Sequence, residues 1–397
     1  MNEPLDGITI LDLTRVVAGG TATMMLADLG AEVIKVEQSG VGDILRHLGG
    51  HQRSGMNAMF LTLGRGKKSI ALDLRNDEAQ KIVRRLAATV DVVIENFRPG
   101  VMGKMGLGPS VLRADNPDLI FVSISGFGQT GPARDEPAYD PIIQARSAMI
   151  ARQTAPGGQP DLVRSFLVDK LAGFYASQAI LAALFARSTG QARGQTIDVP
   201  MMDSSLYFLW TDAISDLALV GDGITPGTVS SQAMVVTPTA DGQVVFLALN
   251  AKERAGVATA VGRTDLLTDP RFATQEEYVK QENYGAFNDA ITTAFSQTST
   301  EAAVKALQKE GIPCSAVVSP EDVLDDVHVR GTDVVVNSVH PVAGPMRQIR
   351  YPAHLDETPA RTALHAPELG ADTAAILHRI GLDGDSIEEL RRQKVVQ

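Results

Sequence analysis

Residues 8–36 read ITILDLTRVVAGGTATMMLADLGAEVIKV and decide the fold class of this chain. Residues 8–14 are rich enough in apolar and β-branched side chains to predict a buried strand, and residues 32–36 predict a second one. Between them, residues 21–29 predict a helix that stops at a glycine. A strand, a helix and a strand in succession are typical of a parallel sheet, so we predict an α/β fold.

The same alternation continues along the chain. Residues 69–74, 92–95 and 119–125 predict three more strands, and residues 77–88 predict a helix after the first of them. Residues 170–187 have the apolar spacing of a long helix. Because ligands of parallel α/β sheets bind beyond the carboxyl ends of the strands, the loops that follow the strands are the candidate binding segments.

A second, smaller domain is predicted in the middle of the chain. Residues 221–233 (GDGITPGTVSSQA) are rich in Gly, Ser, Thr and Pro and predict a linker. Residues 235–249 then predict a β-hairpin, and several helices follow it. Thr298 and Glu301 have the spacing of a capping box at the start of one of these helices. We therefore predict an α+β domain over residues 222–325.

Composition excludes several classes of function. The net charge of −11 disfavours general nucleic-acid binding, and we expect no nucleic-acid partner. We find no apolar run of the ~18–20 residues that a membrane span needs, and no signal peptide. Cys314 is the only cysteine, so no internal disulfide or cysteine-based metal site can form. The single cysteine fits a cytoplasmic location, which we expect. The His residues form no close pair with acidic partners, so we expect no metal site.

Common nucleotide and nucleophile motifs are missing from the sequence. The turn after the first predicted strand lacks GxGxxG, and the chain has neither a P-loop nor a GxSxG elbow. A local excess of Lys and Arg over residues 65–75 fits either a small anionic ligand or a solvated surface. Asp169 directly precedes the long predicted helix, where a carboxylate either caps the helix or acts as an exposed nucleophile.

Several segments together resemble the class III CoA-transferases, also called the CaiB/BaiF family. The resemblance runs along nearly the whole chain and is strongest over residues 4–205. It is carried in chain order by PLDGITILDLTRVVAGG, LADLGAEVIKVE, GKKSIALDL, DVVIENFRPGVMGKMGLG, ISGFGQTGP, AYDPIIQA, VDKLAGFYASQAILAAL and TGQARGQTIDVPMMDS. GIPCSAV and the final QKVV also fit.

The resemblance implies a mechanism and a set of residues. Asp169 would attack an acyl-CoA to give a mixed anhydride and then an aspartyl-CoA thioester, with Tyr139 and Asp140 beside it. Acyl-CoA and a carboxylic acid would be the substrates, with no tightly bound cofactor. The coenzyme A contacts would fall on Arg15, Val17, Lys35, Gln38, Arg46, Leu72, Arg75, Asn96, Phe97, Arg98 and Lys104. For Leu72 and Phe97, packing in the protein core is about as good an interpretation as contact with the adenine of coenzyme A.

Tyr139 favours the transferase branch of the family. The acyl-CoA racemases have a His in the segment that matches AYDPI, whereas this chain has Tyr139 followed by Asp140. A neutral tyrosine, with an ordinary pKa near ~10, is a poor base at pH 7. Two alternatives stay open, which are 2-methylacyl-CoA racemisation and a non-catalytic CoA-binding role. The acyl donor and the acceptor acid cannot be read from the sequence.

The resemblance also implies an architecture. Residues 1–220 and the return segment 326–397 would form a large Rossmann-like domain, and residues 222–325 would form the smaller α+β domain. Two such ring-shaped subunits would interlock as a homodimer.

Overall fold

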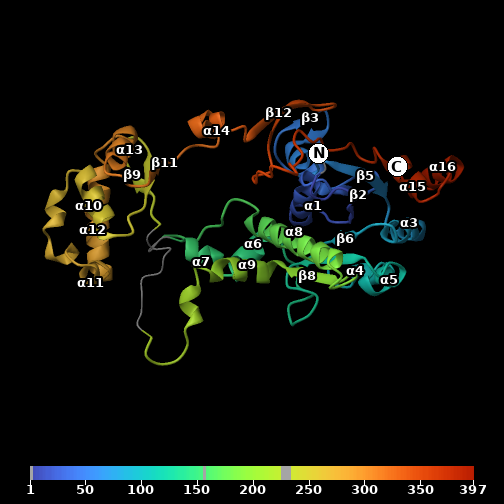
Figure 1. Cartoon of the computed structure of the whole chain (residues 1–397), viewed down its shortest axis with the longest axis horizontal. Helices are drawn as coiled ribbons and strands as arrows, with labels where there is room; N and C mark the ends of the chain where they lie inside the picture. The colour runs from blue at the N-terminus through green and yellow to red at the C-terminus, as the bar shows by residue number, and fades with distance from the viewer. Residues whose placement is uncertain (1–2, 155–157, 225–233) are drawn as a thin grey trace. The chain divides into compact units, whose positions relative to one another are not determined.

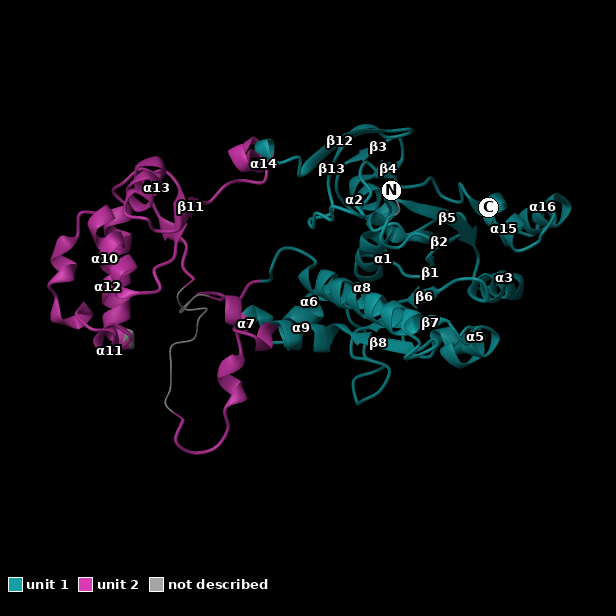
Figure 2. Ribbon diagram, in the orientation of Figure 1, with its two compact units in different colours: residues 1–150, 162–208, 330–397 teal, residues 151–161, 209–329 magenta. Residues whose placement is uncertain are grey.

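The computed structural model describes residues 3–154, 158–224 and 234–397. These form two compact units (Figure 2). Unit 1 contains residues 1–150, 162–208 and 330–397, and unit 2 contains residues 151–161 and 209–329. Unit 2 includes the predicted small domain, and it also takes in residues 151–161 and 209–220 of the predicted large domain and residues 326–329 of the predicted return segment. Most of the predicted linker, residues 225–233, lies outside the described residues.

A six-stranded sheet forms the centre of unit 1 (Figure 1). The strands are β1 (Thr9–Asp12), β2 (Glu32–Gln38), β5 (Lys67–Leu72), β6 (Val92–Glu95), β7 (Ile120–Ser125) and β8 (Thr196–Pro200). Every neighbouring pair in this sheet is parallel, and the order across the sheet is β5-β2-β1-β6-β7-β8. In sheet numbering this is the 3-2-1-4-5-6 order of a Rossmann-type sheet, whose direction of winding reverses between β1 and β6. The predicted parallel α/β fold is confirmed.

Helices cover the sheet on both faces. The main ones are α1 (Ala18–Asp28), α3 (Asp77–Ala87), α5 (Pro109–Asp115), α6 (Asp140–Arg146), α8 (Leu167–Ser188) and α9 (Met201–Trp210). Short elements in unit 1 are η1 (Ile44–Arg46), β3 (Gln52–Arg53), β4 (Met56–Asn57), α2 (Ala58–Leu63) and α4 (Val101–Lys104). Short elements elsewhere are α7 (Met149–Gln153) and η2 (Ser215–Ala218).

The two faces of the sheet differ in chemistry. Leu11, Ile34 and Ile70 point into one apolar core, which α3 closes with side chains such as Ile82 and Val83. The alternate strand positions point to the opposite face, because successive side chains of a strand alternate. There the strands carry buried polar residues, namely Asp12, Lys35, Glu37, Lys67 and Ser69. Thr23 of α1 donates a hydrogen bond to Asp12, which places α1 over this polar face.

Helices α1 and α8 approach each other closely. A Cβ at Gly173 of α8 would lie 2.6 Å from the carbonyl oxygen of Ala18 and 2.8 Å from the Cβ of Thr21. Only glycine therefore allows this separation of the helices. Helix α8 is also long and apolar enough, by length and composition alone, to cross a bilayer. Of its most apolar window 56% is buried inside the protein, as in the core helix of a folded domain.

The end of the chain returns to the sheet of unit 1. Helices α15 (Thr373–Arg379) and α16 (Gly384–Arg392) place Ile376, Leu377 and Ile387 in the same apolar core as α3. Val396 then forms an isolated antiparallel bridge with Leu72 of β5. A hairpin of β12 (Val335–His340) and β13 (Gly344–Ile349), which the sequence analysis did not predict, precedes these helices.

Unit 2 is a small α+β body with its own core. Strands β9 (Thr237–Pro238), β10 (Gln243–Phe246) and β11 (Cys314–Ala316) pair antiparallel, as predicted for the first two. The helices are α10 (Ala251–Ala260), α11 (Gln275–Tyr278), α12 (Gln281–Phe295) and α13 (Thr300–Lys309), with η4 (Thr264–Leu267), η5 (Pro270–Phe272), η6 (Asp322–Asp325) and α14 (Val327–Gly331). The predicted capping box is wrong by one residue. Ser299, not Thr298, caps α13 by accepting a hydrogen bond from the N–H of Ala302.

Candidate active site

A cleft of about 340 Å³ opens where β1, β6, β7 and β8 end. It lies beside the β1–β6 reversal, which is where parallel α/β sheets of this order bind ligands. Asp169 and Tyr139 both line this cleft, together with Arg15 and Arg98. The other lining residues are Val16, Ala18, Asn96, Phe97, Pro99, Ile124, Ser125, Gly126, Arg134, Glu136, Pro137, Ala138 and Met201.

Asn96 joins the two loops at the reversal. Its side-chain oxygen accepts a hydrogen bond from the N–H of Arg15 at 2.8 Å, and its amide nitrogen donates to the carbonyl oxygen of Arg15 at 2.8 Å. The guanidinium of Arg15 lies 5.4 Å from the ring centre of Phe97, close enough for a cation–π contact. Val16 has a φ of 63°, a left-handed conformation that is costly for a β-branched residue. The loop after β1 is thus held in a strained conformation by the loop after β6.

Asp169 lies in the first turn of α8 and has an unusual environment. Helix α8 has no side-chain cap of its own at Phe166. Instead Asp140, at the start of α6, accepts a hydrogen bond from the N–H of Asp169 at 2.9 Å. Burial, and then the negative charge of Asp140, raise the pKa of Asp169 to about 7. Asp169 is therefore a half-buried carboxyl group that ionises near neutral pH, which is a common property of catalytic acids and nucleophiles.

Glu95 is a second carboxyl group without a cation beside the cleft. It ends β6, is buried, and accepts a hydrogen bond from the N–H of Phe97 at 2.7 Å. Burial raises the pKa of Glu95 to about 7 against the opposing hydrogen bonds from Ser123 and Phe97, and the charge of Asp198 adds to the rise. Glu95 fixes the turn that carries Asn96, although the sequence analysis did not single it out.

Two predicted coenzyme A contacts belong to a buried ion network that involves the end of β1, strand β2 with the loop after it, and the first residue of β5. We define this network as Asp12, Lys35, Glu37, Asp43, Arg46 and Lys67. Lys35 pairs with Asp43 at 2.9 Å and donates to the carbonyl oxygen of Thr14. Arg46 binds Glu37 through two hydrogen bonds of 2.7 and 2.8 Å and stacks on Phe60. Both side chains are almost fully buried, so their charges already have partners inside the protein.

The remaining predicted contacts fall into two groups. Val17 and Leu72 are buried in apolar clusters. Arg75 is exposed and forms a two-bonded pair with Asp73, which also accepts a hydrogen bond from Gln38. Lys104 is exposed at the end of α4. The structure therefore brings together Arg15, Asn96, Phe97, Arg98, Tyr139 and Asp169 in one cleft, and places Asp140 directly behind Asp169.

The basic stretch over residues 65–75 is not a set of free cations. Arg65 pairs with Asp28, and Lys67 pairs with Asp12, with all four side chains buried. Lys68 pairs with Glu32, and Arg75 pairs with Asp73 nearer the surface. Neither sequence interpretation, an anion site nor a solvated run, describes the two buried pairs, because their partners come from β1 and α1.

Comparison with known proteins identifies the chain. The sequence model described as CoA-transferase family III matches residues 5–373. The chain belongs to CoA-transferase family III. The family III match covers the whole of unit 2. It leaves out of unit 1 only residues 1–4 and 374–397.

Relatives of this family III protein are similar over nearly their full lengths. The succinyl-CoA–D-citramalate CoA-transferase of Chloroflexus aurantiacus is 33% identical, covering 99% of this chain and 98% of the relative. The succinyl-CoA:glutarate CoA-transferase of Mus musculus is 32% identical, covering 100% and 91%. A crystal structure of a CaiB/BaiF family protein from Brucella suis superposes with a TM-score of 0.82 at 30% identity, covering 96% of this chain and 100% of the other. This family III chain is therefore an enzyme that transfers coenzyme A.

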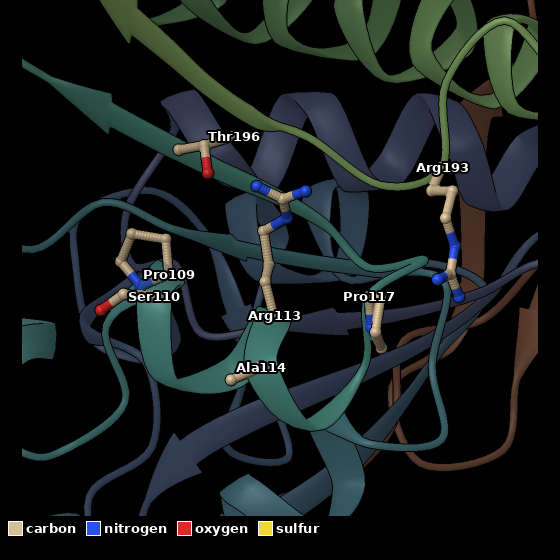
Figure 3. Close-up of a pocket in the computed structure, with 7 residues that line it drawn as sticks. All are labelled: Pro109, Ser110, Arg113, Ala114, Pro117, Arg193 and Thr196. Atoms are coloured by element: carbon tan, nitrogen blue, oxygen red, sulfur yellow. The ribbon is translucent and has the colours of Figure 1, made fainter.

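A second hollow of this family III chain lies at the opposite ends of the strands from the cleft. Arg113 of α5 points toward the strand that carries Thr196, and Arg193 lies on the segment before that strand (Figure 3). Arg193 is paired with Asp118, and Arg113 donates to the carbonyl oxygen of Gly194. No carboxyl group is among the residues that line this hollow, whereas Asp169 lines the cleft. Within residues 3–154, 158–224 and 234–397, no group of three or more metal-binding side chains occurs.

Proposed function

We propose that this enzyme moves coenzyme A from an acyl-CoA thioester to a carboxylic acid, with Asp169 as the covalent nucleophile. The observation that carries the proposal is the carboxyl group of Asp169, which lines the cleft beside Arg15 and Arg98 and has a pKa raised to about 7. A raised pKa makes the carboxylate more basic, and the most effective catalytic pKa lies near the working pH. The names of its relatives support a succinyl-CoA-like donor, which we propose for this chain as well.

The first half of the reaction loads coenzyme A onto the protein. An oxygen of Asp169 attacks the thioester carbonyl, the C–S bond breaks, and the coenzyme A thiolate leaves. The product is a mixed anhydride between Asp169 and the acyl group. The thiolate then attacks the carbonyl carbon of Asp169, the donor carboxylate leaves with one oxygen that came from Asp169, and an aspartyl-CoA thioester remains.

The second half of the reaction runs the same steps in reverse with the acceptor acid. An acceptor oxygen attacks the aspartyl thioester, coenzyme A leaves, and the thiolate then attacks the acceptor carbonyl of the new anhydride. Asp169 is released with one oxygen that came from the acceptor. Tyr139, whose side chain is exposed at the cleft, is suited to donate a hydrogen bond to the anhydride. Arg15 and Arg98 have no carboxylate partner among the described residues, so we propose that they bind the phosphates of coenzyme A.

An isotope experiment tests the covalent route. The protein is mixed with a panel of acyl-CoAs and with acceptor acids that carry ¹⁸O in the carboxylate, and the products are identified by mass spectrometry. With the enzyme in excess over acyl-CoA, so that only one turnover occurs, transfer through Asp169 must release an unlabelled donor acid and leave one ¹⁸O on Asp169, which the mass of the peptide that contains Asp169 reveals. Direct transfer through an anhydride of the two substrates would instead place ¹⁸O in the donor acid and none on Asp169, and would contradict the mechanism. Deuterium incorporation at the α-carbon of a 2-methylacyl-CoA without any acceptor would indicate the racemase instead.

We also propose a homodimer. Apolar side chains project from α8 and α9 into solvent, among them Phe174, Phe185 and Tyr207. Apolar surface of this kind on a folded chain is typical of a protein interface. Sedimentation equilibrium is expected to give twice the chain mass, and a single species near 42.2 kDa would contradict the dimer.

A further inference from the structure

Gln144 connects the residues around Asp169 without lining the cleft. It lies on α6, one helical turn after Asp140, and only 1% of its surface is exposed. Its amide nitrogen donates to Asp140 Oδ1 at 2.6 Å and to the carbonyl oxygens of Val163 and Ser165 at 3.2 and 3.3 Å. Its carbonyl oxygen accepts a hydrogen bond from the N–H of Val163 at 2.9 Å. One buried amide thus ties α6 to the segment that leads into α8.

In this arrangement the carboxylates of Asp140 and Asp169 differ in the hydrogen bonds that they accept. Asp140 receives a hydrogen bond on each oxygen, from the amide of Gln144 on Oδ1 and from the N–H of Asp169 on Oδ2. No hydrogen bond from a described residue reaches the carboxylate of Asp169. Hydrogen bonds to a carboxylate stabilise its charged form, so negative charge in this pair is favoured on Asp140.

We propose that Gln144 is a positioning residue that holds the negative charge of the pair on Asp140 and keeps the carboxylate of Asp169 free of hydrogen bonds for attack. The inference rests on the proposed function, because it assigns Gln144 to the environment of the nucleophile. A charge fixed at Asp140 repels the anion of Asp169 in the ground state. That repulsion disappears when Asp169 becomes a neutral anhydride or thioester, so the arrangement favours the covalent intermediates.

Other charged groups also lie near Asp140 and Asp169, and the experiment has to take them into account. Arg15 and Arg98 line the cleft from the loops after β1 and β6, and Arg134, Glu136 and Tyr139 line it from the segment before α6. Lys170, next to Asp169 on α8, donates to the hydroxyl of Ser165 at 2.7 Å. None of these groups donates to Asp140, so Gln144 is the only side chain described that stabilises its charge directly.

The experiment compares Gln144→Met, Asp140→Asn and the double variant with the wild-type enzyme, using a substrate pair that the isotope experiment has identified. We expect Gln144→Met to lower kcat about 10-fold or more while changing the KM for acyl-CoA less than about 2-fold. The acidic limb of the pH profile of kcat/KM should move to lower pH, because repulsion at Asp169 weakens. Asp140→Asn should move the limb in the same direction.

The double variant separates positioning from mere structural support. If Gln144 acts through Asp140, the two substitutions share one effect, and the double variant should be no slower than Asp140→Asn alone. Additive losses, or an unchanged acidic limb in Gln144→Met, would overturn the proposal. If Gln144→Met does not fold, the limb of Asp140→Asn decides, and an unshifted limb there overturns it equally. Failure of the proposed function is distinct, because the wild-type enzyme would then acquire no ¹⁸O on Asp169.

Discussion

At the carboxyl ends of β1 and β2 the buried carboxylates form ion pairs with buried cations, whereas the carboxyl groups of Glu95, at the end of β6, and Asp169, at the start of α8, form no ion pair with a described residue. Burial pushes the pKa of Asp12 upward, but the charges of Lys35 and Lys67 and the hydroxyls of Thr14 and Thr23 outweigh it and hold the pKa at about 2. Burial raises the pKa of both Asp169 and Glu95 to about 7. The carboxylate of Asp12 is therefore neutralised by cations inside the protein, whereas Asp169 and Glu95 ionise near neutral pH.

This difference teaches which cations can serve a ligand. Lys35 and Arg46 cannot reach a phosphate without leaving Asp43 and Glu37 buried and unpaired, which is costly. Arg15 and Arg98 have no such partner among the described residues and line the cleft. The contrast leads to four predictions, each of which changes one member of one region.

The largest effect is expected at Asp169 itself. Asp169→Asn should lower CoA transfer at least about 10³-fold, because an amide cannot form the anhydride. The same substitution should leave the protein at least as stable at pH 8, since it removes a half-buried charge that forms no ion pair with a described residue. Steady-state kinetics and thermal unfolding measure the two effects. Retention of activity in Asp169→Asn would move the nucleophile elsewhere.

A substitution in the ion network should instead lower the stability of the protein. Lys35→Met leaves Asp12 and Asp43 buried with one cation fewer, so we expect a loss of about 3–5 kcal/mol in the free energy of unfolding. Urea denaturation measures it, and Lys68→Met, which removes an exposed pair with Glu32, is the matched control. Equal losses in the two variants would show that the network is not the source of stability.

Glu95 should make stability depend on pH. Its pKa is raised from the ordinary 4.5 to about 7 in the folded state, so the folded protein binds more protons than the unfolded chain between these values. The free energy of unfolding should therefore fall as pH rises from 5 to 8, by up to about 3 kcal/mol from this group. Glu95→Gln keeps an acceptor for the N–H of Phe97 and should flatten the curve. An unchanged slope would refute the assignment of this fall to Glu95.

The smallest effect is expected at the free cations. Arg98→Ala should raise the KM for acyl-CoA about 10-fold through loss of a charge-assisted contact, with no measurable change in melting temperature. Arg75→Ala, which removes an exposed pair with Asp73, is the paired variant at the other side of the sheet edge. A larger rise in KM for Arg75→Ala than for Arg98→Ala would place the phosphates beside β5 instead.

The strands of the sheet could be predicted because their patterns are local, but side-chain pairing could not. Five of the six sheet strands lie within a few residues of the positions predicted for them. Lys35 and Lys67 look like ligand cations in the sequence, since their acidic partners lie in other elements. The β12–β13 hairpin was not predicted because polar side chains of its strands face inward and apolar ones face outward. His340 and Gln348 point inward and are satisfied by the carbonyl oxygens of Ala366 and Leu364, while Val339 and Ile349 face solvent.

The candidate site was predictable in part. The resemblance pointed to Asp169, Tyr139, Asn96 and Arg98, and the structure places all four in one cleft. Gln144 and Glu95 were not singled out, because their importance depends on what they contact. Glu95 looks like the exposed end of a strand, and Gln144 looks like an ordinary polar residue on a helix. Only the three-dimensional arrangement shows that one is buried without a cation and the other bonds three partners.

The clamp between Asn96 and Arg15 joins residues 81 positions apart in the chain, and this has a consequence for synthesis on the ribosome. A nascent chain that has emerged only as far as β5 already contains β1, α1 and β2, yet Arg15 has no partner for its backbone. The strained turn at Val16 then has nothing to hold it, and closing so long a loop must wait for β6 to add beside β1. The cleft at Asp169 is thus completed only after β6 has added beside β1, so a nascent chain that ends at β5 would lack the coenzyme A site that we propose.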